Sequence, residues 1–80
     1  MTLLADGFED AFRGYGRQFN KVLAIYDYDK CVNVLMKRDG MTEQDAHEWM
    51  EFNVLGAFMG EHTPVFLKEC KIENFKEFEE

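Results

Sequence analysis

The sequence lacks serine altogether, has a single proline and contains no long hydrophobic run. The absence of serine excludes a serine nucleophile. The longest nearly uninterrupted apolar run is about eight residues, whereas a helix needs about 20 to cross a bilayer. The N-terminal end shows no basic segment followed by an apolar core. We therefore expect a soluble protein of the cytoplasm.

Cysteine is also scarce, since Cys31 and Cys70 are the only two. In a reducing compartment both are expected to be free thiols rather than a disulfide. Cys31 falls on the apolar side of an expected helix, where a thiol behaves as a small hydrophobe. No CxxC or HxxxH spacing supports a zinc set with His47 and His62. We expect neither a metal nor another cofactor.

Basic residues are few in the second half of the chain. The net charge is −7, of which residues 1–38 contribute +1 and residues 39–80 contribute −8. Such a charge repels phosphate backbones, so direct nucleic-acid binding is disfavoured and a protein partner with a basic surface is favoured. The same acids could also form a solvated face that only aids solubility.

What the sequence does contain is enough apolar material to fold. Hydrophobic residues make up 46% of the 80 residues and aromatic residues 15%. This composition excludes a disordered chain. A single domain of this size has a small core, so oligomerisation would add useful stability.

The first third of the chain predicts a helix, a connector and a strand. Apolar residues at intervals of three and four predict a helix over residues 3–13. Gly14 and Gly16 predict a flexible connector over residues 14–20, because a GxG without a third glycine is only a weak phosphate-loop signal. The β-branched and aromatic run from Lys21 to Tyr26 predicts a buried strand.

A helix is expected next, from Asp27 as its N-cap to Gly40, which ends it. Asp29 in the first turn and Lys37 and Arg38 in the last turn match the helix dipole. Its buried side is expected to consist of Cys31, Val32, Val34, Leu35 and Met36.

A second helix is expected from the N-cap Thr42, with Asp45 three residues on, to Gly60. Its expected core stripe is Ala46, Trp49, Met50, Asn53 and Ala57. The end of this helix is apolar on every side, and so small a chain has too little interior to bury it. We therefore expect a homodimer or another partner to cover the remaining apolar residues, Phe52, Leu55, Phe58 and Met59.

After Pro64, the residues Val65–Leu67 predict a second strand, and residues 71–78 predict a weak helix. One helical reversal at residues 39–41 would make the two strands antiparallel. The sequence thus predicts a single α+β domain with the order helix, strand, helix, helix, strand, short helix, in which a two-stranded antiparallel sheet packs on a helical pair. Its parts are an N-terminal helix with a Gly-rich connector (residues 1–20), a core (21–68) and an acidic tail prone to fray (69–80).

Two sets of polar residues are candidates for function. Glu43, Glu48 and Glu51 point outward from the second helix and are the first choice for a face that binds a basic partner. A polar rim of Asp27, Asp29, Glu61 and His62 would form between antiparallel strands, and its oxygens and imidazole could hold a divalent cation.

Helix capping by Asp27 and a dipole contact from Asp29 account for both residues without any ligand. A Cys-His nucleophilic pair would need an exposed Cys31 beside a histidine, against its apolar setting. We therefore expect a protein that is not an enzyme.

Several segments of the chain resemble a widespread family of small, acidic, uncharacterised proteins encoded by bacteriophages and prophages. The segments that carry the resemblance are GFEDAF (7–12), GYGR (14–17), AIYDYDKC (24–31), DGMT (39–42), DA (45–46), EFNVLGA (51–57) and GEHTPVF (60–66). The family has no established activity, so the resemblance implies an origin and not a mechanism.

A phage origin implies a modulator or inhibitor of a bacterial host machine, including an anti-defence protein, that acts in the cytoplasm of the host by binding a protein. The alternatives are a phage accessory, structural or assembly protein and, third, a small metal-dependent enzyme.

Overall fold

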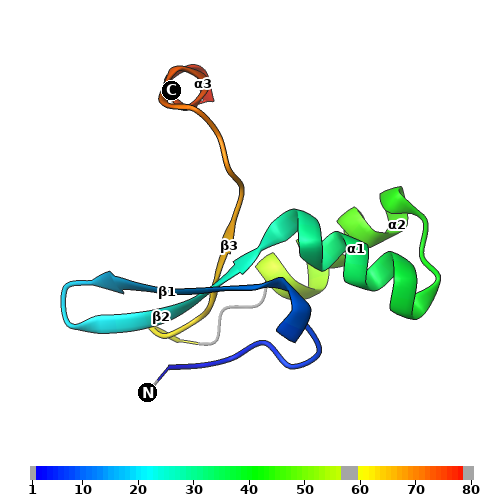
Figure 1. The fold of residues 1–80 in the computed structure, drawn as a ribbon, viewed down its shortest axis with the longest axis horizontal. Coiled ribbons are helices and arrows are strands. Elements are labelled where there is room, and N and C mark those ends of the chain that lie inside the picture. The colour runs from blue at the N-terminus through cyan, green and yellow to red at the C-terminus, as the bar shows by residue number, and fades with distance from the viewer. Residues whose placement is uncertain (1, 57–59, 79–80) are drawn as a thin grey trace.

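A computed structural model describes residues 2–56 and 60–78, which form a small α+β domain with a three-stranded mixed sheet (Figure 1). The strands are β1 (Phe12–Gln18), β2 (Lys21–Asp27) and β3 (Val65–Leu67). The α-helices are α1 (Tyr28–Asp39), α2 (Glu43–Trp49) and α3 (Ile72–Phe78). Two further helical segments are the 3-10 helix η1 (Glu9–Ala11) and the π-helix η2 (Met50–Leu55).

Residues 14–20, which we expected to form a flexible connector, instead complete strand β1 and the turn into β2. The two strands pair as an antiparallel hairpin, with a register shift near Gly14. A Cβ atom at Gly16 would lie 2.8 Å from Ile25 Cδ1, so this glycine makes room for a side chain of the neighbouring strand. The prediction was wrong because Gly16 serves close packing, and Gly14, with a φ of 141°, lies at the irregularity in the strand pairing.

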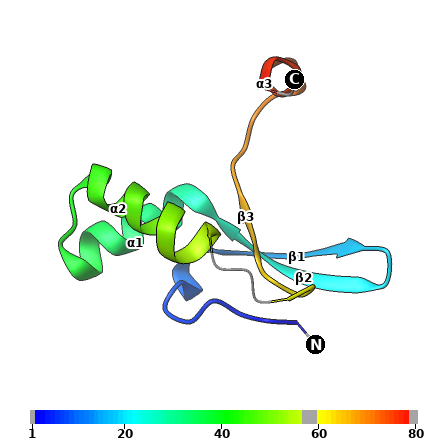
Figure 2. The ribbon, with the colours of Figure 1, turned by 180° about the vertical axis from the view of Figure 1, so that it is seen from behind.

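The helix expected over residues 3–13 is also wrong, because only η1 is helical there. The segment before η1 runs along one side of the sheet (Figures 1 and 2), where the Ala5 amide donates a hydrogen bond of 2.9 Å to the Tyr26 hydroxyl. Gly7, with a φ of 91°, breaks any helix at that point. Phe8, whose spacing suggested a helix, reaches the core from this irregular segment.

The helix expected from Asp27 to Gly40 is confirmed. The Asp27 carboxylate accepts a 3.0 Å hydrogen bond from the Lys30 amide, which makes Asp27 the N-cap. Gly40 ends the helix in the left-handed region, with a φ of 68°. The side of α1 that meets the core carries the buried residues Cys31, Val32 and Leu35 and the partly buried residues Val34 and Met36.

The second helix begins as expected but ends early. Thr42 is its N-cap; beyond Trp49 the chain continues as η2 and stops at Leu55, not at Gly60. Because a π-helix has i→i+5 hydrogen bonds, the inward position moves on by one residue. Asn53 is therefore exposed and Val54 packs against the core in its place. The remaining stripe residue, Ala57, lies outside the described residues, as do Phe58 and Met59.

The sheet has the order β1-β2-β3, and β3 runs parallel to β2, with Ile25 opposite Val65 and Asp27 opposite Leu67. The antiparallel pairing that we expected is wrong. The chain reverses direction between α1 and α2 and again between η2 and β3, and two reversals restore the original direction. The sheet is also one strand wider than expected, because β1 joins it.

The core lies where the helices meet one side of the sheet. Leu35, Met50 and Cys31 are its largest fully buried side chains. Tyr26 lies at the centre of an aromatic row, with ring centroids 5.5 Å from Phe12 and 5.7 Å from Phe66. Within the described ranges, no helix is long and apolar enough to cross a membrane.

The two thiols should differ sharply in reactivity. Burial, with a smaller effect of the Asp27 charge, raises the pKa of the Cys31 thiol to about 11, whereas Cys70 is exposed. Because the thiolate is the reactive form, iodoacetamide at neutral pH should alkylate Cys70 alone in the folded protein and both thiols in guanidinium chloride. Mass spectrometry of the intact protein counts the adducts. Rapid alkylation of Cys31 without denaturant would contradict the packing described for α1.

Candidate protein-binding site

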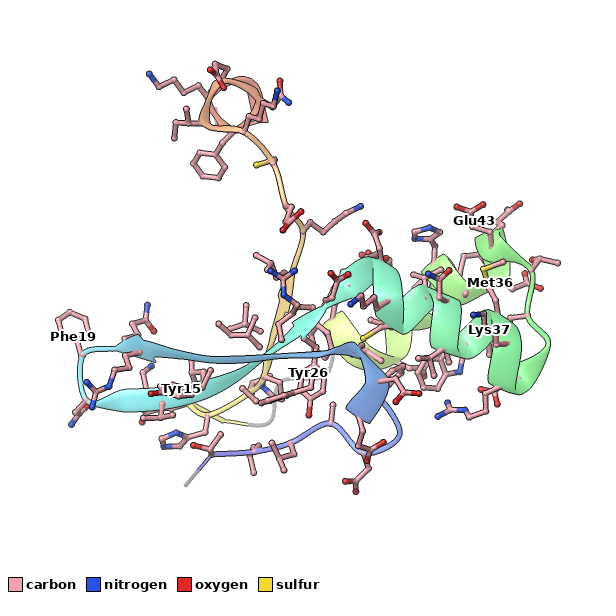
Figure 3. All side chains as sticks on the ribbon, viewed as in Figure 1. Tyr15, Phe19, Tyr26, Met36, Lys37 and Glu43 are labelled. Carbon is pink, nitrogen blue, oxygen red and sulfur yellow. The ribbon has the colours of Figure 1, made fainter. Side chains whose placement is uncertain are left out.

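The helices α1 and α2 lie side by side, joined by the short connection at residues 40–42 (Figure 1). The Thr42 hydroxyl accepts a 3.1 Å hydrogen bond from the Asp45 amide and so starts α2 directly after the turn. Figure 3 shows Lys37 of α1 and Glu43 of α2 at this end of the pair. The turn thus places the acidic start of α2 at the tip of the helical pair.

The three acids that the sequence singled out are exposed on α2 and on the start of η2. Glu43, His47 and Glu51 follow one another at intervals of four residues, so they share one side of the helix. Glu48 lies on the neighbouring side, where its Oε2 atom accepts a 3.5 Å hydrogen bond from Gln44. We call Glu43, Glu48 and Glu51 the acidic face.

Some acids of the chain are paired with a lysine or arginine, but those of the acidic face are not. Asp27, for example, lies 3.2 Å from Arg13. In the part of the chain that the structure describes, no lysine or arginine lies within 4.0 Å of Glu43, Glu48 or Glu51. Their negative charge is therefore not neutralised by a lysine or arginine side chain and remains available to an external cation.

Tyr28 connects the acidic face to α1. Its hydroxyl lies 3.1 Å from Glu51 Oε2 and 3.2 Å from His47 Nδ1. If the hydroxyl donates its one proton to Glu51, it can accept a hydrogen bond from a protonated Nδ1 of His47. The other ring nitrogen, His47 Nε2, lies 3.8 Å from Glu43 Oε2. One buried tyrosine thus anchors a row of three side chains on α2 and η2.

The environment of Tyr28 keeps its hydroxyl protonated at neutral pH. Burial is the main cause that raises its pKa, and the hydrogen bond to Glu51 and the charge of that carboxylate raise it further. The neutral hydroxyl is a hydrogen-bond donor to a carboxylate, which fixes the orientation of Glu51. The Tyr28 hydroxyl thus holds the negative charge of Glu51 in place at the protein surface.

Lysine and arginine side chains fix the segment that leaves β3 beside the start of α1. Lys68 Nζ lies 5.0 Å from the centre of the Tyr28 ring and 4.0 Å from Asp29. Arg13 of β1 lies 3.2 Å from Asp27 and 3.5 Å from Glu69. These contacts direct the chain away from the sheet after β3 ends.

The polar rim is not assembled, because it required antiparallel strands. Asp27 lies opposite Leu67, at the downstream end of β3, whereas Glu61 and His62 lie before that strand begins. Asp27 caps α1 and pairs with arginine, and Asp29 lies beside lysine. Among the residues that the structure places, no group of three or more His, Cys, Asp or Glu side chains is arranged to hold a metal ion.

The apolar residues outside the core stripe are exposed where the structure describes them. Phe52 is 81% exposed and Leu55 is 44% exposed. Phe58 and Met59, the other two residues of that predicted contact surface, lie outside the described residues. The role of this surface in association stays a prediction.

Three residues of the site were not predicted from the sequence: Tyr28, His47 and Lys68. The four-residue spacing of Glu43, His47 and Glu51 was a usable signal for a shared helix face. The contribution of Tyr28 depends on how two helices pack, and that of Lys68 depends on the parallel strand, so no local pattern contained either.

Asp27 should make stability depend on pH in the acid range. The hydrogen bond from the Lys30 amide, opposed by partial desolvation and assisted by Arg13, lowers its pKa below the ordinary value of 3.8. A carboxylate with a lowered pKa stabilises the fold above the unfolded value and loses that effect as the pH falls through the folded value. Asp27→Asn, which keeps a capping side chain, should be less stable than the natural chain at pH 7 and approach it below 3.8. Urea titrations from pH 7 to below 3.8 measure the difference in the free energy of unfolding between the two proteins. A difference that does not change with pH would show that the Asp27 charge does not stabilise the fold.

The hydrogen bonds of Tyr28 should contribute measurably to the pairing of α1 and α2. Replacing Tyr28 with phenylalanine keeps the buried ring and should lower the free energy of unfolding by about 1 kcal/mol. Tyr15→Phe is the matched control, since Tyr15 is 68% exposed and should change little. Urea denaturation of both variants at neutral pH gives the comparison. We call Tyr28, His47 and Glu51 the Tyr28 cluster. Equal stability of the two variants would show that this cluster does not hold the helices together.

Comparison of the chain with models of protein families, with curated proteins and with solved structures found no match. Any function assigned to this site therefore depends on the geometry of the acidic face and of the Tyr28 cluster.

Proposed function

We propose that this protein acts without catalysis, by binding a partner protein that has a basic surface, through the acidic face. The observation that carries the proposal is the exposure of Glu43, Glu48 and Glu51, which have no lysine or arginine neighbour among the described residues. A basic partner would supply the missing cations. Because the acids lie on one short helical stretch, a single patch of the partner could contact all three.

The charge of the whole second half supports the same proposal. Residues 39–80 carry −8 in total, so the acidic face lies within a larger negative field. Such a field accelerates encounter with a basic surface and makes association sensitive to salt, over a Debye length of about 8 Å at physiological ionic strength. The field repels nucleic-acid backbones, so a protein that itself binds nucleic acid through a basic groove is a fitting partner.

The Tyr28 cluster supports binding in a second way. Glu51 is held by the Tyr28 hydroxyl, and Glu43 lies beside His47. Side chains that are already ordered lose less conformational entropy when a partner contacts them. The acidic face is thus partly preorganised.

The class of partner follows from the resemblance to small acidic phage proteins. We propose that the partner is a host protein in the bacterial cytoplasm, whose activity this chain modulates or inhibits, as an anti-defence protein would. An accessory or assembly role would present the same face to a phage protein. Identification of the bound partner distinguishes these two roles.

Charge reversal on the acidic face should weaken partner binding and leave the fold intact. The double variant Glu43→Lys/Glu48→Lys avoids Glu51, which Tyr28 holds, and should raise the Kd for a purified basic partner by about tenfold or more at physiological salt. The matched control is Asp6→Lys/Glu61→Lys, which changes the net charge equally at two exposed residues elsewhere. Affinity capture from bacterial lysate with mass spectrometry first identifies the partner, and calorimetry then measures each Kd.

Both variants should keep the natural melting temperature within a few degrees, since exposed substitutions usually change stability by about 0.5 kcal/mol or less. An equal loss of affinity in the control would show that only net charge matters. Unchanged affinity in the Glu43→Lys/Glu48→Lys variant would identify the acidic face as a feature that aids solubility alone.

A further inference from the structure

The two faces of the sheet differ in what covers them. Paired residues of antiparallel strands share a face, so the register places Tyr15 with Ala24 on one face and Gly16 with Leu23 on the other. Figure 3 shows Tyr15 and Tyr26 on the side along which the N-terminal segment runs. The central residues of that covered face, Ala24 and Tyr26, are buried.

The second face, which we call the open face, is largely apolar, and none of the described residues forms a layer over it. Its central residues are Gly14, Gly16, Leu23, Ile25, Val65 and Leu67, while Lys21 lies at one end and Asp27, paired with Arg13, at the other. Val65 is 41% exposed, and no helix packs on this face in the ranges 2–56 and 60–78 (Figures 1 and 2). Because a sheet normally buries its apolar face against another layer, the open face is suited to contact a further element.

One side of helix α3 is a second apolar surface, on which none of the described helices or strands packs. It stands apart from the domain, at the end of the segment that leaves β3 (Figures 1 and 2). Ile72 and Phe75 are exposed, at 64% and 44%, and their three-residue spacing places them on one side of the helix. An isolated helix of this length is barely stable in water, so α3 needs a surface to pack on.

We infer that two copies of this chain form a dimer in which α3 of each copy packs on the open face of the other. The contacts of the segment between β3 and α3 favour packing of α3 on the other copy, which we call exchange, over packing on its own sheet. Glu69 lies 3.5 Å from Arg13, and Lys68 lies 4.0 Å from Asp29 and over the Tyr28 ring. These contacts hold the segment in the direction that carries α3 away from its own sheet, where a second copy can meet it.

The area available also favours reciprocal exchange. A buried phenylalanine removes about 150–250 Å² from water, and the surface that it covers removes a similar area. One α3 carrying Ile72 and Phe75 would therefore bury only about half of the roughly 1,200–2,000 Å² that a stable interface needs. Two copies of the same contact reach that range. This dimer uses surfaces other than the acidic face, so it is independent of the proposed function.

A charge-swap experiment tests the exchange. Phe75→Lys places a cation on α3, and Val65→Glu places an anion on the open face. Each variant alone should be a folded monomer, with a dimer dissociation constant raised more than about thirtyfold, because its new charge would be buried unpaired. An equal mixture should form a heterodimer, since one contact is then natural and the other joins opposite charges.

Size-exclusion chromatography with light scattering at micromolar concentration measures these masses, and circular dichroism confirms that each variant is folded. The natural chain and the control Phe52→Lys, which alters an exposed apolar residue of η2, should both be dimers. A natural chain that is monomeric at these concentrations overturns the inference. So does a mixture that stays monomeric, or a Phe52→Lys variant that alone loses the dimer, which would move the contact to η2.

Discussion

The carboxylate of Asp27 is the junction on which the arrangement of sheet and helices depends. It ends the central strand β2, caps α1 through the Lys30 amide and pairs with Arg13 of β1. One side chain therefore fixes the direction in which α1 leaves the sheet. Tyr28 follows at once, and its buried ring can reach α2 only because α1 starts in this direction.

The features that the sequence predicted correctly are local ones. The N-cap at Asp27, the end of α1 at Gly40 and the start of α2 at Thr42 each depend on a few neighbouring residues. The helix expected over residues 3–13 had the right apolar spacing, but Gly7 breaks it and the sheet offers that segment other hydrogen bonds. Local sequence patterns thus predicted where helices begin and end. They did not predict that the N-terminal segment would lie along the sheet and not form a helix.

The features that the sequence did not predict depend on contacts between distant segments. The predicted direction of β3 was wrong, because the second reversal of the chain, between η2 and β3, is not marked by a strong local sequence pattern. The exposure of Glu43, Glu48 and Glu51 followed from helix periodicity. Their attachment to Tyr28 required knowledge of how the two helices pack, and the separation of Glu61 from Asp27 required the parallel register.

The π-helix η2 is a place where the chain can lose one residue without disturbing the hydrophobic core. Its i→i+5 hydrogen bonds contain one residue more per turn than an α-helix would need. A one-residue deletion within residues 51–53 would convert this turn to α-helical spacing and still leave Met50 and Val54 on the same side, three positions apart. Such a deletion in α1 would instead rotate half of the core stripe into water. The hydrophobic core therefore tolerates a change of one residue in chain length at η2 but not in α1.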